Sequence, residues 1–218
     1  MSKGKFNVKG IMFDLDGTIL DTKPAYVEAA RIAFKATGQD TPEMSTALQI
    51  PKRIEQKQPI NDLVKTDVKA FLDVYLRTFY TISASETKPF PNVASTLETL
   101  SQKAKLAVIT MRFVPGNAII SELEQFHLNK YFTHVVTALD THKPKPSPEA
   151  LIKAVAAMDV QMCDCIIVGD SVVDVKAGKA AGAKTVAVLS GLYSRAELME
   201  AEPNFIINDI AELTDLVD

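Results

Sequence analysis

The chain has 218 residues, of which 47% are hydrophobic and 23% are charged, and its formal net charge is −3. This composition supports a sizeable core and excludes a disordered chain. The small negative charge, without basic blocks, argues against nucleic acid or an anionic membrane as a partner. No apolar run is long enough to span a bilayer, and the polar start does not resemble a secretory signal, so we expect a cytoplasmic protein.

Short apolar runs alternate with longer amphipathic stretches along the chain. The runs are β-branched and continuous, as in strands that are covered on both faces. In chain order, the expected strands are 8–13, 106–109, 134–138, 166–168, 185–189 and 205–207. The expected helices are 24–36, 62–80, 92–103, 115–126, 148–158 with Ser147 as its N-cap, and 172–181 with Gly182 as its C-cap. The alternation predicts an α/β fold with a doubly wound, mostly parallel, Rossmann-like sheet.

The long stretch between the first two expected strands does not follow this alternation. It contains two helical patterns and no convincing strand, and a single crossover helix would need far fewer residues. The segment "TKPFPN", with two prolines, is a natural hinge at its end. We therefore predict a core formed by residues 1–22 and 91–218, and a small helical domain, 23–90, inserted after the first strand.

Polar residues gather at the expected carboxyl ends of the strands, where open α/β sheets bind ligands. "DLDGT" places Asp14 and Asp16 after the first strand. Later strand ends add Thr110 in "VITMR", Lys145 in "HKPKPSPE", and Asp170, Ser171 and Asp174 in "GDSVVD". Carboxylates that share a crevice repel one another and need a cation, and all-oxygen ligands with phosphate nearby suit Mg²⁺. A lysine and a hydroxyl opposite the metal would stabilise an anionic group, so the set predicts Mg²⁺-dependent handling of a phosphoryl group.

With these four motifs in order, the sequence resembles the haloacid dehalogenase superfamily over essentially the whole chain. It is most similar to the phosphoglycolate-phosphatase-like phosphatases, which carry a helical cap after the first motif. The resemblance implies that residues 23–90 form the cap and that Mg²⁺ is the cofactor. It also implies that the enzyme hydrolyses a small phosphorylated metabolite, phosphoglycolate-like or a sugar phosphate, through an aspartyl-phosphate intermediate.

The resemblance also implies a role for each catalytic residue. Asp14 would be the nucleophile, and Asp16 would be the general acid and base. Thr110 would hydrogen-bond the phosphoryl oxygens, and Lys145, for which Lys143 is a competing choice, would neutralise the phosphoryl charge and order the nucleophile.

Metal, substrate and supporting roles follow from the same resemblance. The metal ligands would be Asp14, the backbone carbonyl of Asp16, and Asp170. The residues that contact substrate or phosphate would be Gly17, Met111 and Arg112, of which the last two differ from the residues that the family often has there. The supporting residues would be Asp174, Ser171 and Thr18, the last by bracing Asp16.

Other functions share parts of this pattern. A phosphomutase of the β-phosphoglucomutase type keeps all four motifs and differs chiefly in the cap, and a pyrophosphatase is a further alternative. A phosphonatase would need a cap lysine, for which Lys52 and Lys57 are candidates. A dehalogenase lacks the second acid, so Asp16 argues against it. From another class, a receiver-like signalling domain uses similar residues but needs no helical insert. No motif indicates an oligomeric state.

Overall fold

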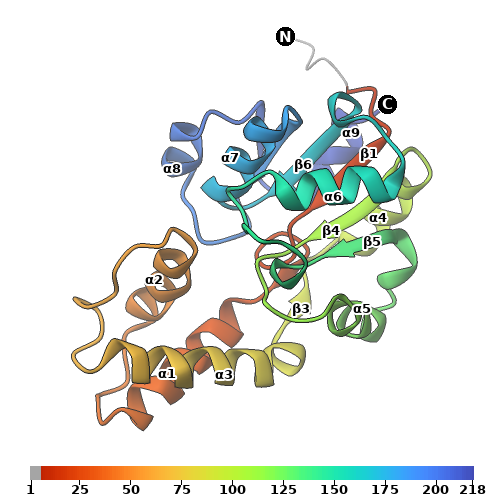
Figure 1. Ribbon diagram of the computed structural model, residues 1–218. Coiled ribbons are helices and arrows are strands. Elements are labelled where there is room, and N and C mark those ends of the chain that lie inside the picture. Colours follow the sequence, from red (N-terminus) through yellow and green to blue (C-terminus); the bar gives the residue numbers. More distant parts are fainter. Residues whose placement is uncertain (1–5) are drawn as a thin grey trace. The chain divides into compact units, whose positions relative to one another are not determined.

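The computed structural model describes residues 6–218, which divide into two compact units (Figure 1). The larger unit comprises the described residues up to Leu20 together with Pro89–Asp218, and the smaller unit is Asp21–Lys88. Two strands of two residues each, β2 (Leu20–Asp21) and β3 (Lys88–Pro89), pair where the chain passes between the units. The sequence predicted no strand there, because two residues are too few to show a period of two.

A six-stranded parallel sheet forms the larger unit, in the order β5-β4-β1-β6-β7-β8. Its strands are β1 (Gly10–Phe13), β4 (Lys105–Ile109), β5 (Phe132–Val136), β6 (Cys165–Gly169), β7 (Lys184–Val188) and β8 (Phe205–Ile207). The predicted α/β fold with a parallel sheet is therefore confirmed. Phe13 lies opposite Val108 on one side and Val168 on the other. The strand order thus reverses at β1, and such a switch point is where open sheets bind ligands.

Helices cover both faces of this sheet (Figure 1). On one face, α6 (Glu149–Met158) and α7 (Val172–Ala181) pack in a cluster with Met12 of β1. On the other face, α4 (Val93–Ser101), α5 (Gly116–Gln125) and α9 (Leu213–Leu216) pack with Ile11 and Phe13. Successive side chains of a strand point to opposite faces, so the continuous apolar run of β1 follows from burial on both sides.

In the larger unit, the helices differ from the sequence-based ones at their ends and by two additional short helices. Gly182 ends α7 with φ 82°, as predicted, since glycine adopts the left-handed conformation at little cost. The helix α6 begins at Glu149 rather than at Pro148, although the Glu149 N–H still donates to Ser147 Oγ at 3.3 Å. The short helix α8 (Arg195–Glu200) and α9 were not predicted, because so few turns show little periodicity.

The smaller unit contains α1 (Lys23–Ala36), α2 (Met44–Glu55) and α3 (Val68–Glu86). Small side chains of α1 and aromatic side chains of α3 share its core, which includes Ala25, Ala29, Ala33, Phe71, Tyr75 and Phe79. The predicted helix 62–80 begins later than expected, because the Asp67 carboxylate accepts the Lys69 N–H at 2.9 Å and caps the helix there. The helix α2 was not predicted, since Pro51 lies inside it.

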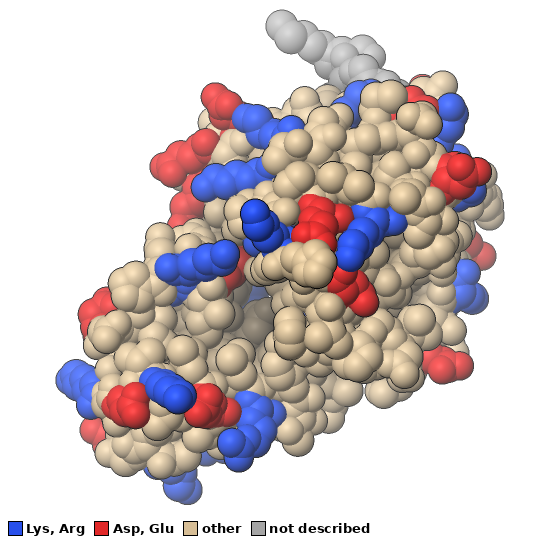
Figure 2. Space-filling model, viewed as in Figure 1, with Lys and Arg blue, Asp and Glu red and all other residues tan. Residues whose placement is uncertain are grey.

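Charges of both signs lie close together on the face of the molecule that Figure 2 shows. Within residues 6–218, no helix combines the length and the apolar character that crossing a membrane requires.

Candidate active site

The site lies at the carboxyl ends of the central strands of the larger unit. Asp14 follows β1, and its N–H donates to the Val168 carbonyl at 2.8 Å, which anchors it to β6. Thr110 follows β4, and its N–H donates to the Val136 carbonyl at 3.0 Å. Asp170 follows β6 and stands directly before α7. Parallel pairing thus brings together residues that are distant in the sequence.

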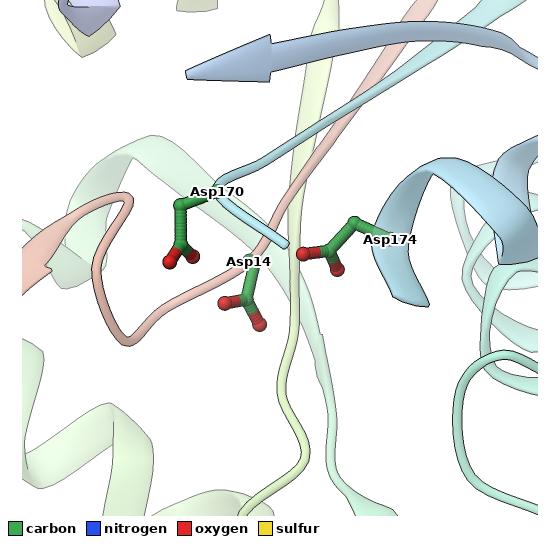
Figure 3. A group of neighbouring side chains, drawn as sticks. All are labelled: Asp14, Asp170 and Asp174. Carbon is green, nitrogen blue, oxygen red and sulfur yellow. The ribbon is translucent and has the colours of Figure 1, made fainter. Parts of the chain in front are cut away.

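Three buried carboxylates gather at this edge, on Asp14, Asp170 and Asp174 (Figure 3). One oxygen of each lies within 4.8 Å of the others. Burial raises the pKa of Asp14 well above its ordinary value; the negative charges of Asp174 and Asp16 add to this rise, and Lys145 opposes it. Concentrated carboxylate oxygens are the donor set that a hard cation such as Mg²⁺ takes, and a bound cation would favour the ionised form.

Lys145 joins two of these carboxylates. Its Nζ donates to Asp14 Oδ1 at 2.7 Å and Asp174 Oδ1 at 2.6 Å, and also to the Ile109 carbonyl at 3.2 Å. The residue is 1% exposed; burial opposes its charge, but the charges of Asp14 and Asp174 outweigh this and raise its pKa. Lys143, the competing lysine in the sequence, is exposed, and its backbone N–H donates to Glu149. Lys145 is therefore the lysine that contacts Asp14.

The first turn of α7 fixes the Asp174 carboxylate. Its Oδ2 accepts the Ser171 hydroxyl at 2.7 Å and the Ser171 N–H at 3.2 Å, in a reciprocal capping box. Its Oδ1 is thereby turned towards Lys145. A side chain at Gly169 would overlap Asp174, so the strand end needs a glycine there.

Asp170 is held by residues from two other loops. Thr18 Oγ1 donates to Asp170 Oδ1 at 3.2 Å, which corrects the expectation that Thr18 braces Asp16. The Leu192 N–H, in the loop after β7, donates to Asp170 Oδ2 at 3.3 Å. A Cβ at Gly17, whose φ is +83°, would lie 2.6 Å from the same oxygen, and one at Gly191 would overlap it. Sequence reasoning missed the loop after β7, although a Ser-Gly pair at that strand end was a usable signal.

Asp16 is paired with Arg112 rather than with a residue of the carboxylate cluster. Arg112 Nε and Nη2 donate to Asp16 at 2.9 and 2.7 Å, and its Nη1 pairs with Glu122 of α5. Burial opposes the charge of Arg112, but Asp16 and Glu122 outweigh this and raise its pKa. The expectation that Arg112 contacts substrate phosphate stays a prediction; in the structure its guanidinium contacts two carboxylates.

Glu122 was not found from the sequence. It lies on the buried face of α5, between Ile119 and Leu123. An acidic residue on the apolar face of a helix predicts a buried cationic partner, because a buried charge is costly unless it is paired. The sequence does not indicate which residue that partner is.

The remaining predicted residues lie at the same strand end. Thr110 is buried, and its Oγ1 accepts the Arg112 N–H at 3.1 Å. Met111 is half-buried between them. Together, the described residues form a cluster of three carboxylates that could hold a cation, next to Lys145 and to a fourth carboxylate, that of Asp16.

Comparisons with known proteins agree with this arrangement. The profile of the family described as Haloacid dehalogenase-like hydrolase matches residues 11–188. The chain is similar to a phosphoglycolate phosphatase of Nitrosospira multiformis, at 29% identity over 223 residues and 96% of each chain. It is also similar to pyrophosphatase PpaX of Anoxybacillus flavithermus, at 27% identity over 218 residues and 97% of each chain. A solved hydrolase of the haloacid dehalogenase-like family from Streptococcus pneumoniae shares the fold, with a TM-score of 0.79 at 19% identity, over 95% of this chain and 97% of that one.

Proposed function

Because the chain belongs to the haloacid dehalogenase-like hydrolase family, we propose that it is a Mg²⁺-dependent phosphomonoester hydrolase with an aspartyl-phosphate intermediate. The observation that carries this proposal is the placing of Asp14, which lies among acidic oxygens suited to Mg²⁺ and is held at one oxygen by Lys145. A carboxylate oriented beside positive charge can act as a nucleophile towards phosphorus. Names of relatives support a small phosphorylated metabolite as the substrate.

In the first step, an Asp14 carboxylate oxygen attacks phosphorus in line. The new O–P bond forms as the P–O bond to the leaving alcohol breaks, and Asp16 gives its proton to that alcohol. Lys145, which already donates to Asp14 Oδ1, and Thr110 would hold the charge of the transferring group. Bound Mg²⁺ would neutralise the carboxylates and the phosphoryl oxygens, with Asp14, the Asp16 carbonyl and Asp170 as its protein ligands.

In the second step, water hydrolyses the aspartyl-phosphate. Asp16 takes a proton from water, whose oxygen attacks phosphorus, and the bond between phosphorus and the Asp14 oxygen breaks. Inorganic phosphate leaves, and the Asp14 carboxylate is regenerated.

We also propose that the smaller unit, Asp21–Lys88, is the cap that selects the substrate. The insertion of this unit supports the proposal, because the chain enters it directly after the "DLDGT" motif and leaves it before β4. The small net charge and the lack of basic blocks support an enzyme without nucleic acid or anionic membrane partners.

The experiment that tests this function measures phosphate release from a panel of small phosphate esters and pyrophosphate, with Mg²⁺ and with EDTA. We expect release from the wild type only with Mg²⁺, and none from Asp14→Asn. Turnover that survives in Asp14→Asn would falsify the covalent mechanism. A folded wild type that releases phosphate from no ester would instead favour the mutase or the phosphonatase.

A further inference from the structure

A buried chain of charges, Asp16–Arg112–Glu122, runs from the strand end into α5. Arg112 is 4% exposed and Glu122 is 5% exposed. A buried ion pair is weak support for stability, because removing both partners from water costs about as much as their attraction returns. These ion pairs are therefore better explained by the position in which they hold the side chains than by a gain in stability.

The contact between Arg112 and Asp16 is made through two nitrogens. Nε lies 3.2 Å from Asp16 Oδ1 and 2.9 Å from Oδ2, and Nη2 lies 2.7 Å from Oδ1. A planar guanidinium that contacts both oxygens fixes the rotation of a carboxylate as well as its position, whereas a lysine ammonium fixes only a distance. The orientation of Asp16 is therefore set by Arg112.

Glu122 fixes Arg112 in turn. It contacts Nη1, whereas Asp16 contacts Nε and Nη2, and it does so from a helix whose neighbouring side chains Ile119 and Leu123 are buried. Asp16 and Arg112 both lie in loops that follow strands, so Glu122 is the contact that ties the guanidinium to a helix. A contact made from a helix keeps its geometry better than one made from a loop alone.

The two carboxylate oxygens of Asp16 differ in the number of contacts that they make with Arg112. Oδ1 accepts from both Arg112 nitrogens, at 2.7 Å from Nη2 and 3.2 Å from Nε, whereas Oδ2 accepts from Nε alone, at 2.9 Å. A carboxylate oxygen has two lone pairs, so Oδ2 keeps one that can accept a proton.

We propose that Arg112 is a positioning residue that orients Asp16 to deprotonate the water that hydrolyses the aspartyl-phosphate. This inference rests on the proposed function and assigns Arg112 to the second step rather than to substrate binding. In that step a water proton moves to Asp16, the water oxygen bonds to phosphorus, and the bond from phosphorus to Asp14 breaks.

The test uses p-nitrophenyl phosphate, whose leaving group departs without a proton, so that the first step does not depend on Asp16. The variant is Arg112→Met with Glu122→Gln, which avoids leaving a buried glutamate unpaired. We expect kcat to fall about 10- to 100-fold, as for a displaced acid–base group, while kcat/KM stays within about threefold. Stopped-flow absorbance should then show a burst of about one p-nitrophenolate per active site, because phosphoenzyme accumulates.

Several variants separate this role from others. Arg112→Lys keeps the charge but not the two-nitrogen contact, so it should also show a burst and a lowered kcat. Arg195→Met, which removes an exposed arginine on α8, should behave as wild type. If the double variant fails to fold, Glu122→Gln alone should give a smaller fall in kcat with the same burst.

Three results would overturn the proposal. A raised KM with unchanged kcat would make Arg112 a substrate-binding residue. Wild-type kinetics with only a lowered melting temperature would make its role structural, and full activity in Arg112→Lys would show that charge alone suffices. Asp14→Asn is the separate control for the proposed function, because it should release no p-nitrophenolate; release from that variant would contradict the covalent mechanism and not the role of Arg112.

Discussion

The replacement Asp14→Asn should stabilise the metal-free protein while it abolishes turnover. Asp14 shares a buried site with Asp170 and Asp174, and Lys145 is the cation in contact with it. At an effective dielectric constant of about 20, charges 4.8 Å apart repel by about 3.5 kcal/mol, and the contact of 2.7 Å with Lys145 attracts by about 6 kcal/mol. The repulsion of Asp14 by Asp170 and Asp174 therefore roughly offsets its attraction to Lys145. The net contribution of the Asp14 charge to stability is then the cost of burying that charge.

Asparagine removes that cost and keeps an oxygen that can accept from Lys145, which also retains Asp174 as a partner at 2.6 Å. We expect the free energy of unfolding in EDTA to rise by about 1–3 kcal/mol at neutral or higher pH. The folded-state pKa of Asp14 is raised, so the wild type loses stability as pH rises through that pKa. The gain from asparagine should accordingly be larger at about pH 8 than at about pH 5.

Urea denaturation of both proteins in EDTA at the two pH values measures this gain. Asp164→Asn is a matched control, because Asp164 is at the surface and a hydrogen bond from Lys9 lowers its pKa; neutralising it should cost a little stability. If wild type and Asp14→Asn have the same free energy of unfolding in EDTA at the higher pH, the buried Asp14 charge does not destabilise the metal-free protein. That result would refute this reasoning.

Other predictions concern the lysine, the glycine and the metal. Lys145→Met should abolish turnover and destabilise the fold by about 3–5 kcal/mol in urea denaturation, because it leaves buried carboxylates uncompensated. The exposed Lys143→Met should change neither kinetics nor stability measurably. Gly191→Ala should raise the Mg²⁺ concentration for half-maximal activity, because its Cβ would displace the Asp170 carboxylate. Inorganic phosphate should raise the melting temperature when Mg²⁺ is present and not in EDTA, as differential scanning fluorimetry can test.

The central part of the fold could be predicted from the sequence because its strands are buried on both faces. Such strands appear as continuous apolar runs, and parallel pairing brings all their carboxyl ends to one edge. That reasoning was enough to place Asp14, Lys145, Asp170 and Asp174 together from the sequence alone. It could not separate Lys145 from Lys143 by geometry, since the two differ in burial and not in residue type.

The partners of these residues could not be predicted in the same way. Thr18 contacts Asp170 rather than its sequence neighbour Asp16, because the turn after β1 directs it across to β6. Gly191 is required only because the Asp170 carboxylate occupies the space of its side chain. Such requirements depend on which atoms meet in space, and they leave no local pattern in the sequence.

The position of Arg112 also changes the charge that a phosphoryl group would meet. A cation at a strand end resembles an anion-binding residue, but here two carboxylates of the chain itself already neutralise it. Lys145 is likewise shared by two carboxylates. The acidic residues of the site outnumber its two cations, the acids being Asp14, Asp16, Glu122, Asp170 and Asp174. A phosphate dianion would be repelled by this surplus, so under the proposed function its binding, and not only its turnover, must depend on a divalent cation at the carboxylate cluster.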